Sequence, residues 1–406
     1  MRIAIISSCS LPVPAVNGGA VESLIETIVK ENELQDQLDI DVYTIFNQQA
    51  KQISEKYPHT TFRYLVKNSL VKSLDKFITL LLRIVKQNKS LASRNYVWKL
   101  IVISKLKKQL KEYMYDKIVL ENTIYLFDIF KDKQLYDKYS GKIFFHIHNS
   151  LVKKTTVEYG KLLKRNISIS DYLHPNIKHF FDKNVDIVTV HNGVDSSMFG
   201  GYLTKSERIE IRNKYHIPVE NKIIIFVGRI TPEKGIRETI DAFCRLKRND
   251  CNLLIVGASY FGSGTISPFE SEMIKKIKDN PRIHMTGYVD QNEIWKLYAL
   301  GNIALLPSMW DEPLGLTMIE AQATGVPLIT TKSGGILETV DEKYSILLDR
   351  DDDIVENICV AMEKILNHQA EWNVKAQHAQ KRVKEYFDNA FFYREFIKAL
   401  DVPKGQ

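Results

Sequence analysis

Short apolar runs rich in isoleucine and valine alternate along the chain with segments whose apolar positions recur every three to four residues. Uninterrupted apolar runs are typical of strands buried on both faces, and the longer spacing is typical of helices. Strands are predicted at residues 2–7, 40–46, 117–120, 142–148, 167–170, 186–190, 222–228, 252–257, 282–288, 302–307, 326–330 and 345–348. Because strands and helices alternate throughout, we predict an α/β protein with doubly wound parallel sheets.

The strands form two series that meet near residues 200–220, where GGYLTKSER has glycines and charges but no periodicity. Such a stretch is typical of a domain boundary. We predict one Rossmann-like domain at 1–203, a second at 204–385, and a final helical segment at 386–406. Doubly wound sheets bind ligands beyond the carboxyl ends of their strands. Two such domains facing each other would place one cleft between them.

Composition agrees with a soluble, two-domain protein, since the 406 residues are 44% hydrophobic and 26% charged. Four scattered cysteines favour a reducing compartment, and no apolar stretch has the length of a signal peptide or a membrane-spanning helix. We therefore expect a cytoplasmic protein. The net charge of +7 is uneven: residues 67–117 hold 13 basic and 3 acidic residues, a balance of +10, which leaves −3 elsewhere.

Two strand-to-helix loops carry residues suited to binding phosphate. The first loop ends in Gly18 and Gly19 at the start of a helix, where backbone amides can approach an anion. The corresponding loop of the second domain reads VGRITPEKG and places Gly228, Arg229 and Lys234 after a strand. Two cations at that position suit a diphosphate leaving group. Taken singly, the first loop is equally well explained as a flexible turn, and the second is better explained as a solvated pair of surface charges.

A third stretch, EPLGLTMIEAQATG, holds two carboxylates in an otherwise apolar segment. Glu312 is expected in a loop ahead of a helix, and Glu320 about 7 Å along that helix from Gly315. A ligand across the helix start could contact both acids, with its phosphates near the amides of Gly315 and Leu316. Taken singly, Glu320 reads as a surface charge on a helix and Glu312 as an acid favoured by the helix dipole.

Taken together and in this order, these motifs resemble the retaining GT-B glycosyltransferases of family 4, also called glycosyl transferases group 1, of the polysaccharide-biosynthesis type. The resemblance covers nearly the whole chain. It includes NGVD at 192–195, GYV at 287–289, LLPSMWDEPLGLTMIEAQATGVPLITT at 305–331 and GGILE at 334–338. It departs from the family at Leu314, where phenylalanine is more frequent, and in the C-terminal segment, which lacks the family's tryptophan.

The resemblance implies a role for each candidate residue of the second domain. Glu320 would hold the ribose of a nucleotide sugar and Glu312 the hydroxyls of the donor sugar. Arg229 and Lys234 would bind the diphosphate next to Gly228. The amides of Gly315 and Leu316 would complete the donor site.

In the first domain, Gly18 and Gly19 would pack against the phosphates and the acceptor. His148 would lie close to the donor sugar, while His146, two residues earlier on the same strand, is expected to be a hydrogen-bonded core histidine. The final segment would cross back to the first domain.

The implied reaction moves a hexosyl unit, most often from a UDP-sugar, to a saccharide or to a polyprenyl-diphosphate-linked saccharide during capsule or exopolysaccharide synthesis. The anomeric configuration would be retained, with neither a cofactor nor a metal. A DxD pattern at Asp349 to Asp351 is expected to be only a charged loop. Two alternatives remain open: a GT-B nucleotide-sugar epimerase, and a catalytically silent envelope or coat binding protein.

The basic segment at 67–117 mixes lysines with leucine, isoleucine and aromatic residues at helical spacing. Such helices lie on anionic membranes, so the protein is expected on the inner face of the cell membrane. The alternative is that the apolar face packs on the first domain and the lysines are solvated. No nucleic-acid-reading motif is present, and no nucleic-acid partner is expected.

Overall fold

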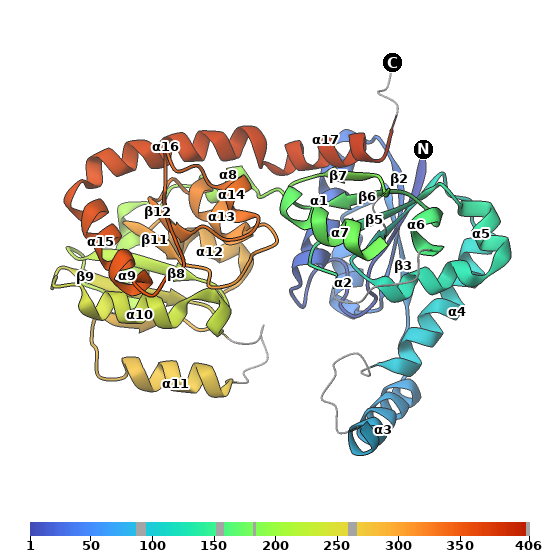
Figure 1. The fold of residues 1–406 in the computed structure, drawn as a ribbon, viewed down its shortest axis with the longest axis horizontal. Coiled ribbons are helices and arrows are strands. Elements are labelled where there is room, and N and C mark those ends of the chain that lie inside the picture. Colours follow the sequence, from blue (N-terminus) through green and yellow to red (C-terminus); the bar gives the residue numbers. More distant parts are fainter. Residues whose placement is uncertain (87–94, 152–157, 182–183, 259–265, 403–406) are drawn as a thin grey trace. The chain divides into compact units, whose positions relative to one another are not determined.

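The computed structural model describes residues 1–86, 95–151, 158–181, 184–258 and 266–402, and it divides into two compact units (Figure 1). Unit 1 consists of Met1–Ile169, Leu173–Val190 and Tyr393–Gln406, and unit 2 of Ser170–Tyr172 and His191–Phe392. Each unit is built on one sheet in which all neighbouring strands are parallel. The predicted pair of doubly wound α/β domains is confirmed.

Unit 1 has a seven-stranded sheet in the order β3-β2-β1-β4-β5-β6-β7. Its strands are β1 (Arg2–Ile6), β2 (Asp39–Ile45), β3 (Thr60–Leu65), β4 (Lys117–Glu121), β5 (Ile143–Ile147), β6 (Leu163–Ser168) and β7 (Ile187–Thr189). Its helices are α1 (Ala20–Gln35), α2 (Gln48–Ser54), α3 (Ser69–Lys86), α4 (Tyr96–Glu112), η2 (Ile124–Lys131), α5 (Lys133–Tyr139), α6 (Glu158–Leu162) and α7 (His174–Phe181), with η3 (Asp171–Leu173) where the units meet along the chain. The central strands β1, β4 and β5 are almost wholly buried, which explains their unbroken apolar sequences.

Strand β3 was not predicted from the sequence. It is the edge strand of the sheet, paired only with β2, and its middle residues are half-buried. An edge strand needs no continuous apolar run, and TTFRYL has none. The missed strand therefore extends the sheet without moving the carboxyl edge where ligands bind.

Unit 2 has a six-stranded sheet in the order β10-β9-β8-β11-β12-β13. Its strands are β8 (Lys222–Val227), β9 (Cys251–Val256), β10 (Ile283–Met285), β11 (Ile303–Leu306), β12 (Leu328–Thr331) and β13 (Ile346–Leu348). Its helices are α8 (Ser196–Phe199), α9 (Lys205–Lys214), η4 (Pro232–Lys234), α10 (Ile236–Arg245), α11 (Pro268–Ile277), α12 (Gln291–Tyr298), α13 (Leu316–Ala323), α14 (Ile336–Thr339), α15 (Ile354–Asn367) and α16 (Gln369–Tyr386). The core of this unit joins β8, β9 and β11 to α10 and α15.

The chain passes from unit 1 to unit 2 at Val190 and His191, earlier than the predicted boundary at 203 and 204. The reason is that the NGVD stretch belongs to the second unit. Backbone hydrogen bonds join Val194 to Phe387 and to Asn389 at 2.8 and 3.0 Å, and α8 packs against α12 and α13. The composition change near residue 200 marks the loop after α8 instead of the boundary.

The last helix, α17 (Asn389–Ala399), returns the chain to unit 1. The hydroxyl of Tyr393 donates to Asn32 of α1 at 2.6 Å, and the ring of Phe396 lies 5.7 Å from that of His146. Lys117 at the start of β4 donates to the carbonyl of Leu400. The C-terminal segment thus completes the covering of the first sheet.

No helix in the described ranges is both long enough and apolar enough to span a membrane.

Candidate active site

The residues expected to bind a donor lie at the carboxyl edge of the unit 2 sheet. Strands β8 and β11 are parallel neighbours, so the loop after β8 and the loop after β11 begin side by side. Gly228 and Arg229 follow β8 directly, and the amide of Gly228 donates to the carbonyl of Val256 at 3.0 Å. The loop after β11 carries Glu312 and ends at α13, which begins at Leu316.

The two loops touch at Gly235, a residue that sequence reasoning missed. Gly235 has φ 70°, and a Cβ atom there would lie 1.8 Å from the carbonyl oxygen of Pro307. The amide of Met309 also donates to the carbonyl of Glu233 at 2.9 Å. This close contact sets the position of Lys234 relative to the second loop.

Substituting Gly235 by alanine is expected to destabilise unit 2 strongly, by about 3 kcal/mol or more, because both the backbone conformation and the space forbid a side chain. Gly287 is the matched control: it also has φ 70°, but a Cβ atom there meets nothing within 4 Å. Gly287→Ala should therefore cost only about 1 kcal/mol. Denaturant unfolding of both variants measures the difference, and equal midpoints would contradict the close contact.

Lys234 and Glu312 form an ion pair between the two loops. The side chain of Glu312 is 6% exposed and that of Lys234 is 20% exposed. Ser308 donates a second hydrogen bond to the same Glu312 oxygen at 3.0 Å, and the Lys234 ammonium lies 5.8 Å from the centre of the Trp310 ring. A cation and an acid are thus held together, nearly out of water, at the binding edge.

Two adjacent glycines, Gly334 and Gly335, pack closely against the backbone of Glu312 and Pro313. The amide of Gly335 donates to the carbonyl of Glu312 at 2.8 Å. A Cβ atom on Gly334 would lie 2.3 Å from that carbonyl, and one on Gly335 would lie 2.3 Å from the carbonyl of Pro313. The GGILE motif therefore serves to seat the loop that presents Glu312.

Arg229 does not join this pair. Its side chain is 43% exposed, and its guanidinium lies 3.6 Å from Glu233, four residues along the same loop. An exposed pair of this kind is worth little, so the guanidinium can turn toward an anionic ligand at small cost. Lys234 thus contacts Glu312, whereas Arg229 is exposed and lies beside Glu233.

Glu320 is buried, in contrast to the surface position that its helix alone would suggest. It lies on α13, whose N-cap is Gly315 with φ 90°, and only 4% of its surface is exposed. Burial raises the pKa of Glu320 to about 7, while a 2.7 Å hydrogen bond from Gln291 acts in the opposite direction. A buried carboxylate with one protein donor retains capacity for further donors, such as ribose hydroxyls.

In unit 1, Gly18 and Gly19 have φ 71° and 112°, and Gly19 precedes the first residue of α1. A Cβ atom on Gly19 would lie 2.4 Å from a carboxylate oxygen of Glu22, which is buried. Burial raises the pKa of Glu22, and Ser8 donates to it at 3.4 Å. An acid at this helix start would repel a phosphate but could accept a hydrogen bond from a hydroxyl. Of the two contacts expected for the glycine pair, this favours the acceptor saccharide over the donor phosphates.

His148 follows β5 at the carboxyl edge, and His146 lies within the strand. Both rings contact Glu121, the last residue of β4: His148 Nε2 at 2.8 Å and His146 Nδ1 at 3.1 Å from the same oxygen. His146 is fully buried and hydrogen-bonded, and His148 is 6% exposed. Sequence reasoning missed Glu121, although a charged residue ending the apolar strand KIVLE was a usable signal.

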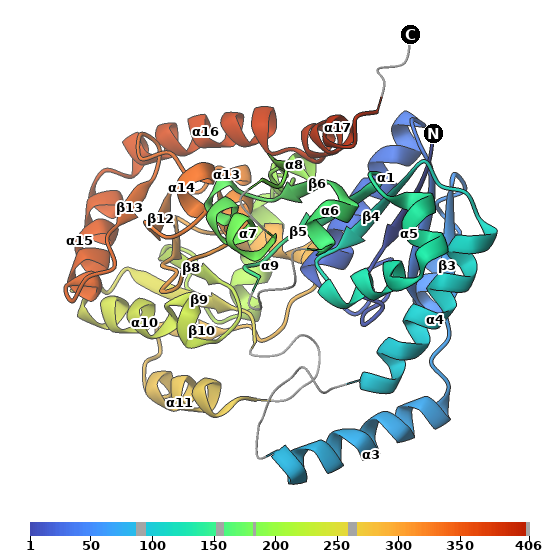
Figure 2. The same ribbon diagram turned by 45° about the vertical axis from the view of Figure 1, so that its right-hand side comes forward.

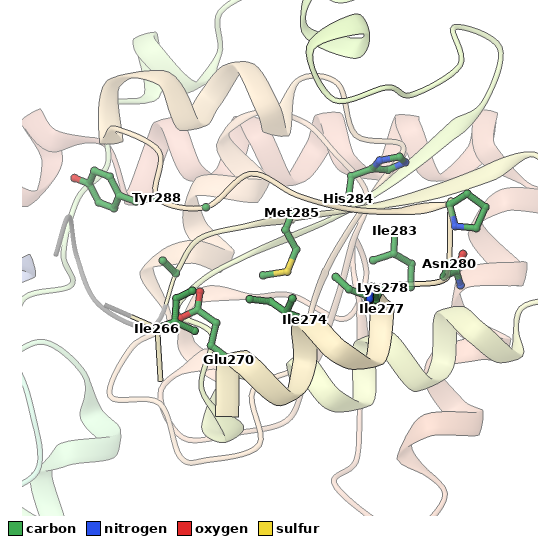
Figure 3. A pocket seen from close by; sticks show the side chains of 13 residues that line it. Ile266, Glu270, Ile274, Ile277, Lys278, Asn280, Ile283, His284, Met285 and Tyr288 are labelled. Atoms are coloured by element: carbon green, nitrogen blue, oxygen red, sulfur yellow. The ribbon is translucent and has the colours of Figure 1, made fainter. Parts of the chain in front are cut away.

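A pocket of about 690 Å³ lies elsewhere in unit 2. Figure 3 shows Ile274 and Ile277 of α11 facing Ile283 and Met285 of β10 across it. Its lining is mostly apolar and includes none of the expected donor-binding residues. The stretch from Asp349 to Asp351 lies in a loop, where Arg350 pairs with Asp311 and Asp349 lies near Lys332.

Comparisons with known proteins agree with this geometry. Residues 207–383 match the family model described as Glycosyl transferases group 1. The chain is 25% identical to YtcC of Bacillus subtilis over 402 residues, which is 95% of this chain and 88% of that protein. It is 22% identical to the lipopolysaccharide 1,2-N-acetylglucosaminetransferase of Salmonella typhimurium over 291 residues, covering 67% of this chain and 73% of that enzyme.

The solved structure of Anabaena HepE in complex with UDP and glucose is similar in fold, with a TM-score of 0.73 at 17% identity over 99% of both chains. Together with the two Rossmann-like sheets and the family match on unit 2, these findings support a GT-B glycosyltransferase.

Proposed function

We propose that this chain is a retaining, metal-independent hexosyltransferase that uses a UDP-sugar to extend a glycan, carried on a polyprenyl diphosphate, in cell-surface polysaccharide synthesis. The observation that carries the proposal is the contact between Lys234 and Glu312 at the carboxyl edge of unit 2, with the buried Glu320 on the helix that follows. Support for the donor comes from HepE, which was crystallised with UDP and glucose. Support for the setting comes from the Salmonella relative, which acts on lipopolysaccharide.

In the proposed reaction, the bond between the anomeric carbon and the diphosphate oxygen breaks while the acceptor hydroxyl attacks from the same face. The departing diphosphate takes up the acceptor proton. Lys234 stabilises the charge that grows on the leaving group, and Arg229 can turn from Glu233 to the same phosphates. Glu312 accepts hydrogen bonds from hydroxyls of the donor sugar, and Glu320 accepts them from the ribose. Neither an epimerase nor a silent binding protein is favoured by the comparisons.

The test is a thermal-shift panel of UDP-, GDP- and ADP-sugars, followed by turnover of the best ligand with free and polyprenyl-linked saccharides. We expect a UDP-sugar to stabilise the protein most and the product to keep the donor's anomeric configuration by NMR. Turnover should persist in EDTA. Isomerisation of the donor without transfer would indicate an epimerase, and donor binding with neither transfer nor hydrolysis would indicate a silent binding protein.

We further propose that α3 places the protein on the anionic inner face of the cell membrane. Four apolar side chains of this helix, at positions 70, 74, 77 and 80, are between 49% and 73% exposed. They repeat every three to four residues, while Lys72 and Lys76 are exposed on other sides of the helix. Figures 1 and 2 show α3 beyond the end of α4, away from the sheet of unit 1. Residues 87–94 of the basic segment lie outside the described residues.

The helix is held in this position by a buried acid. Asp75 of α3 pairs with Lys67 at 2.8 Å and accepts a hydrogen bond from the amide of Val97, at the start of α4, at 2.9 Å. In turn, Trp98 donates to the carbonyl of Cys9 at 2.9 Å, which fixes α4 to the first loop of the unit. These contacts therefore hold α3 in an orientation that leaves its apolar face exposed to solvent. An apolar face rimmed with lysine suits an anionic lipid surface.

Replacing Leu70, Leu74 and Phe77 together by serine is expected to lower binding to phosphatidylglycerol vesicles at least about tenfold, because each lost side chain removes buried apolar area. Sedimentation with vesicles measures the bound fraction, and phosphatidylcholine vesicles should bind weakly. The matched control substitutes three equally exposed apolar residues of unit 2, namely Leu337, Val360 and Val374. Equal loss in both triple variants would contradict a specific role of α3.

A further inference from the structure

The cluster of Glu121, His146 and His148 is built into the carboxyl edge of the unit 1 sheet. Strands β4 and β5 are parallel neighbours, and Glu121 is the register partner of His146. Asn122, which has φ 46°, closes the edge: its amide donates to the carbonyl of His146 at 2.8 Å, and its side-chain oxygen accepts from the amide of His148 at 2.9 Å. The strand register and the contacts of Asn122 therefore fix the backbone positions from which the three polar side chains extend.

Glu121 is the shared hydrogen-bond acceptor of the cluster. It is 1% exposed, and its oxygens lie within 3.3 Å of His146 Nδ1 and 2.8 Å of His148 Nε2. Burial alone would raise the pKa of this carboxyl, but the two histidines lower it to about 2. An ionised carboxylate has no proton to donate, so each imidazole must donate an N–H to it.

This requirement assigns the tautomer of His148. Burial and the neighbouring His146 lower the pKa of His148 to about 4, so the ring is neutral at pH 7 and carries one proton. That proton must lie on Nε2, where it is donated to Glu121. The other nitrogen, Nδ1, is left as an acceptor, and it is buried with no hydrogen-bond partner among the described residues.

We propose that Glu121 is a positioning residue that holds the His148 ring with its proton on Nε2, so that the Nδ1 lone pair accepts a hydrogen bond from a saccharide hydroxyl of the substrate. The inference rests on the proposed function, since it is the function that supplies such a hydroxyl. His148 is the member of the pair that can reach a ligand, because its side chain is 5% exposed and that of His146 is fully buried. A buried acceptor without a partner is costly unless a ligand satisfies it.

Among the described residues, two other groups near the cluster do not assign the tautomer. Burial is the main cause of the raised pKa of Glu22 on α1, and the charge of Glu121 adds to it. Phe396 of α17 packs on the ring of His146 and offers no donor to its Nε2. The ligand atoms of Glu121, His146 and His148 also lie within 4.8 Å of one another, as in a metal site. Because distances of 2.8 to 3.3 Å are those of ordinary hydrogen bonds, hydrogen bonding from the two imidazoles to Glu121 accounts for this geometry.

The first experiment measures the tautomer in the full-length protein without substrate, using NMR of ¹⁵N-labelled histidine with His148→Gln for assignment. Protonated and bare ring nitrogens differ in ¹⁵N shift, so His148 should show a protonated Nε2 and a bare Nδ1 at pH 7. In Glu121→Gln, the neutral amide oxygen is a weaker acceptor than the carboxylate that both rings share. The preference of His148 for a proton on Nε2 should then weaken, and its ¹⁵N shifts should move toward a mixture of the two tautomers. A wild-type His148 protonated on Nδ1 would overturn the proposal.

The second experiment measures turnover. Glu121→Gln should lower kcat about 10- to 100-fold while the affinity for UDP alone stays unchanged, because UDP has no sugar hydroxyl beyond the ribose. A change in the KM of the nucleotide sugar would place the hydroxyl on the donor sugar, and a change in the KM of the saccharide would place it on the acceptor. Asp137→Asn, the same change at an exposed residue of unit 1, is the matched control and should keep wild-type turnover.

Wild-type turnover in Glu121→Gln would overturn the proposal, as would one equivalent of metal bound to the purified chain and lost in His146→Gln. Failure of the proposed function has a different signature: the wild-type protein would turn over no nucleotide sugar, while the NMR measurement would still decide the role of Glu121.

Discussion

Replacing Lys234 by methionine is expected to lower kcat at least about 100-fold. Lys234 lies at the carboxyl edge of the unit 2 sheet with its side chain 20% exposed, and its partner Glu312 is 5% exposed. A fixed cation in a poorly solvated site stabilises the leaving diphosphate much more than one in water. Methionine keeps the length and packing of the side chain and removes only the charge. Steady-state kinetics with the best donor measures the loss.

The same substitution is also expected to destabilise unit 2, by about 1–3 kcal/mol, because among the described side chains it leaves Glu312 buried with Ser308 alone as a donor. A fall in activity could then be mistaken for a fall in folded protein. The double variant Lys234→Met and Glu312→Gln separates the two effects, since it removes both charges while the glutamine oxygen can still accept hydrogen bonds from sugar hydroxyls. We expect its melting temperature to recover toward that of the wild type while kcat stays low.

Lys276→Met is the matched control, since Lys276 pairs with Asp241 on the surface of the same unit with about a third of each side chain exposed. Its kcat should equal that of the wild type. Recovery of activity in the double variant would show that Lys234 serves stability alone, and the proposed role in leaving-group stabilisation would be wrong.

Much of this architecture could be predicted from sequence because buried parallel strands have an unmistakable signature. Strands β1, β8 and β11 were found from short, unbroken apolar runs rich in isoleucine or leucine. The edge strand β3 was missed because half-buried residues leave no such run. The position of the boundary between the units depends on which sheet the NGVD stretch packs against, and local composition does not encode that choice.

The positions of the candidate site residues were predictable to the extent that these residues follow strands. Lys234 and Glu312 were identified singly, but their contact depends on Gly235 lying against Pro307, a long-range approach that no local pattern shows. Glu121 was missed because its role depends on pairing with β5. Glu320 was misjudged as a helix-surface charge when taken alone. Its neighbours Ile319 and Ala321 are also buried, and a charge inside such an apolar helix was the available signal.

Glu320→Gln is expected to stabilise the free protein while weakening its hold on the donor. Because the pKa of Glu320 is raised to about 7 in the folded state, folding favours the protonated form, and ionisation costs folding free energy as the pH rises from about 4.5 through 7. Glutamine is never charged, so the variant should gain up to about 3 kcal/mol over the wild type above pH 7. Below about pH 4.5 the wild-type carboxyl is protonated in both states, and the gain should vanish.

Donor binding should respond in the opposite direction. In the proposed site, ribose hydroxyls donate to the ionised carboxylate, so wild-type affinity for UDP should rise as the pH rises through 7, and the glutamine variant should bind about 10- to 100-fold more weakly at pH 8. Thermal melts from pH 4.5 to 8.5, with and without UDP, measure both effects in one series. Glu293→Gln, at an exposed ion pair with Lys296 on α12, is the control and should change neither. If Glu320→Gln is no more stable than the wild type at pH 8, the pKa of Glu320 is not raised. If this variant also binds UDP like the wild type, Glu320 does not bind the ribose. If both effects are found, the cost of holding Glu320 among apolar neighbours is explained by the nucleotide that it binds.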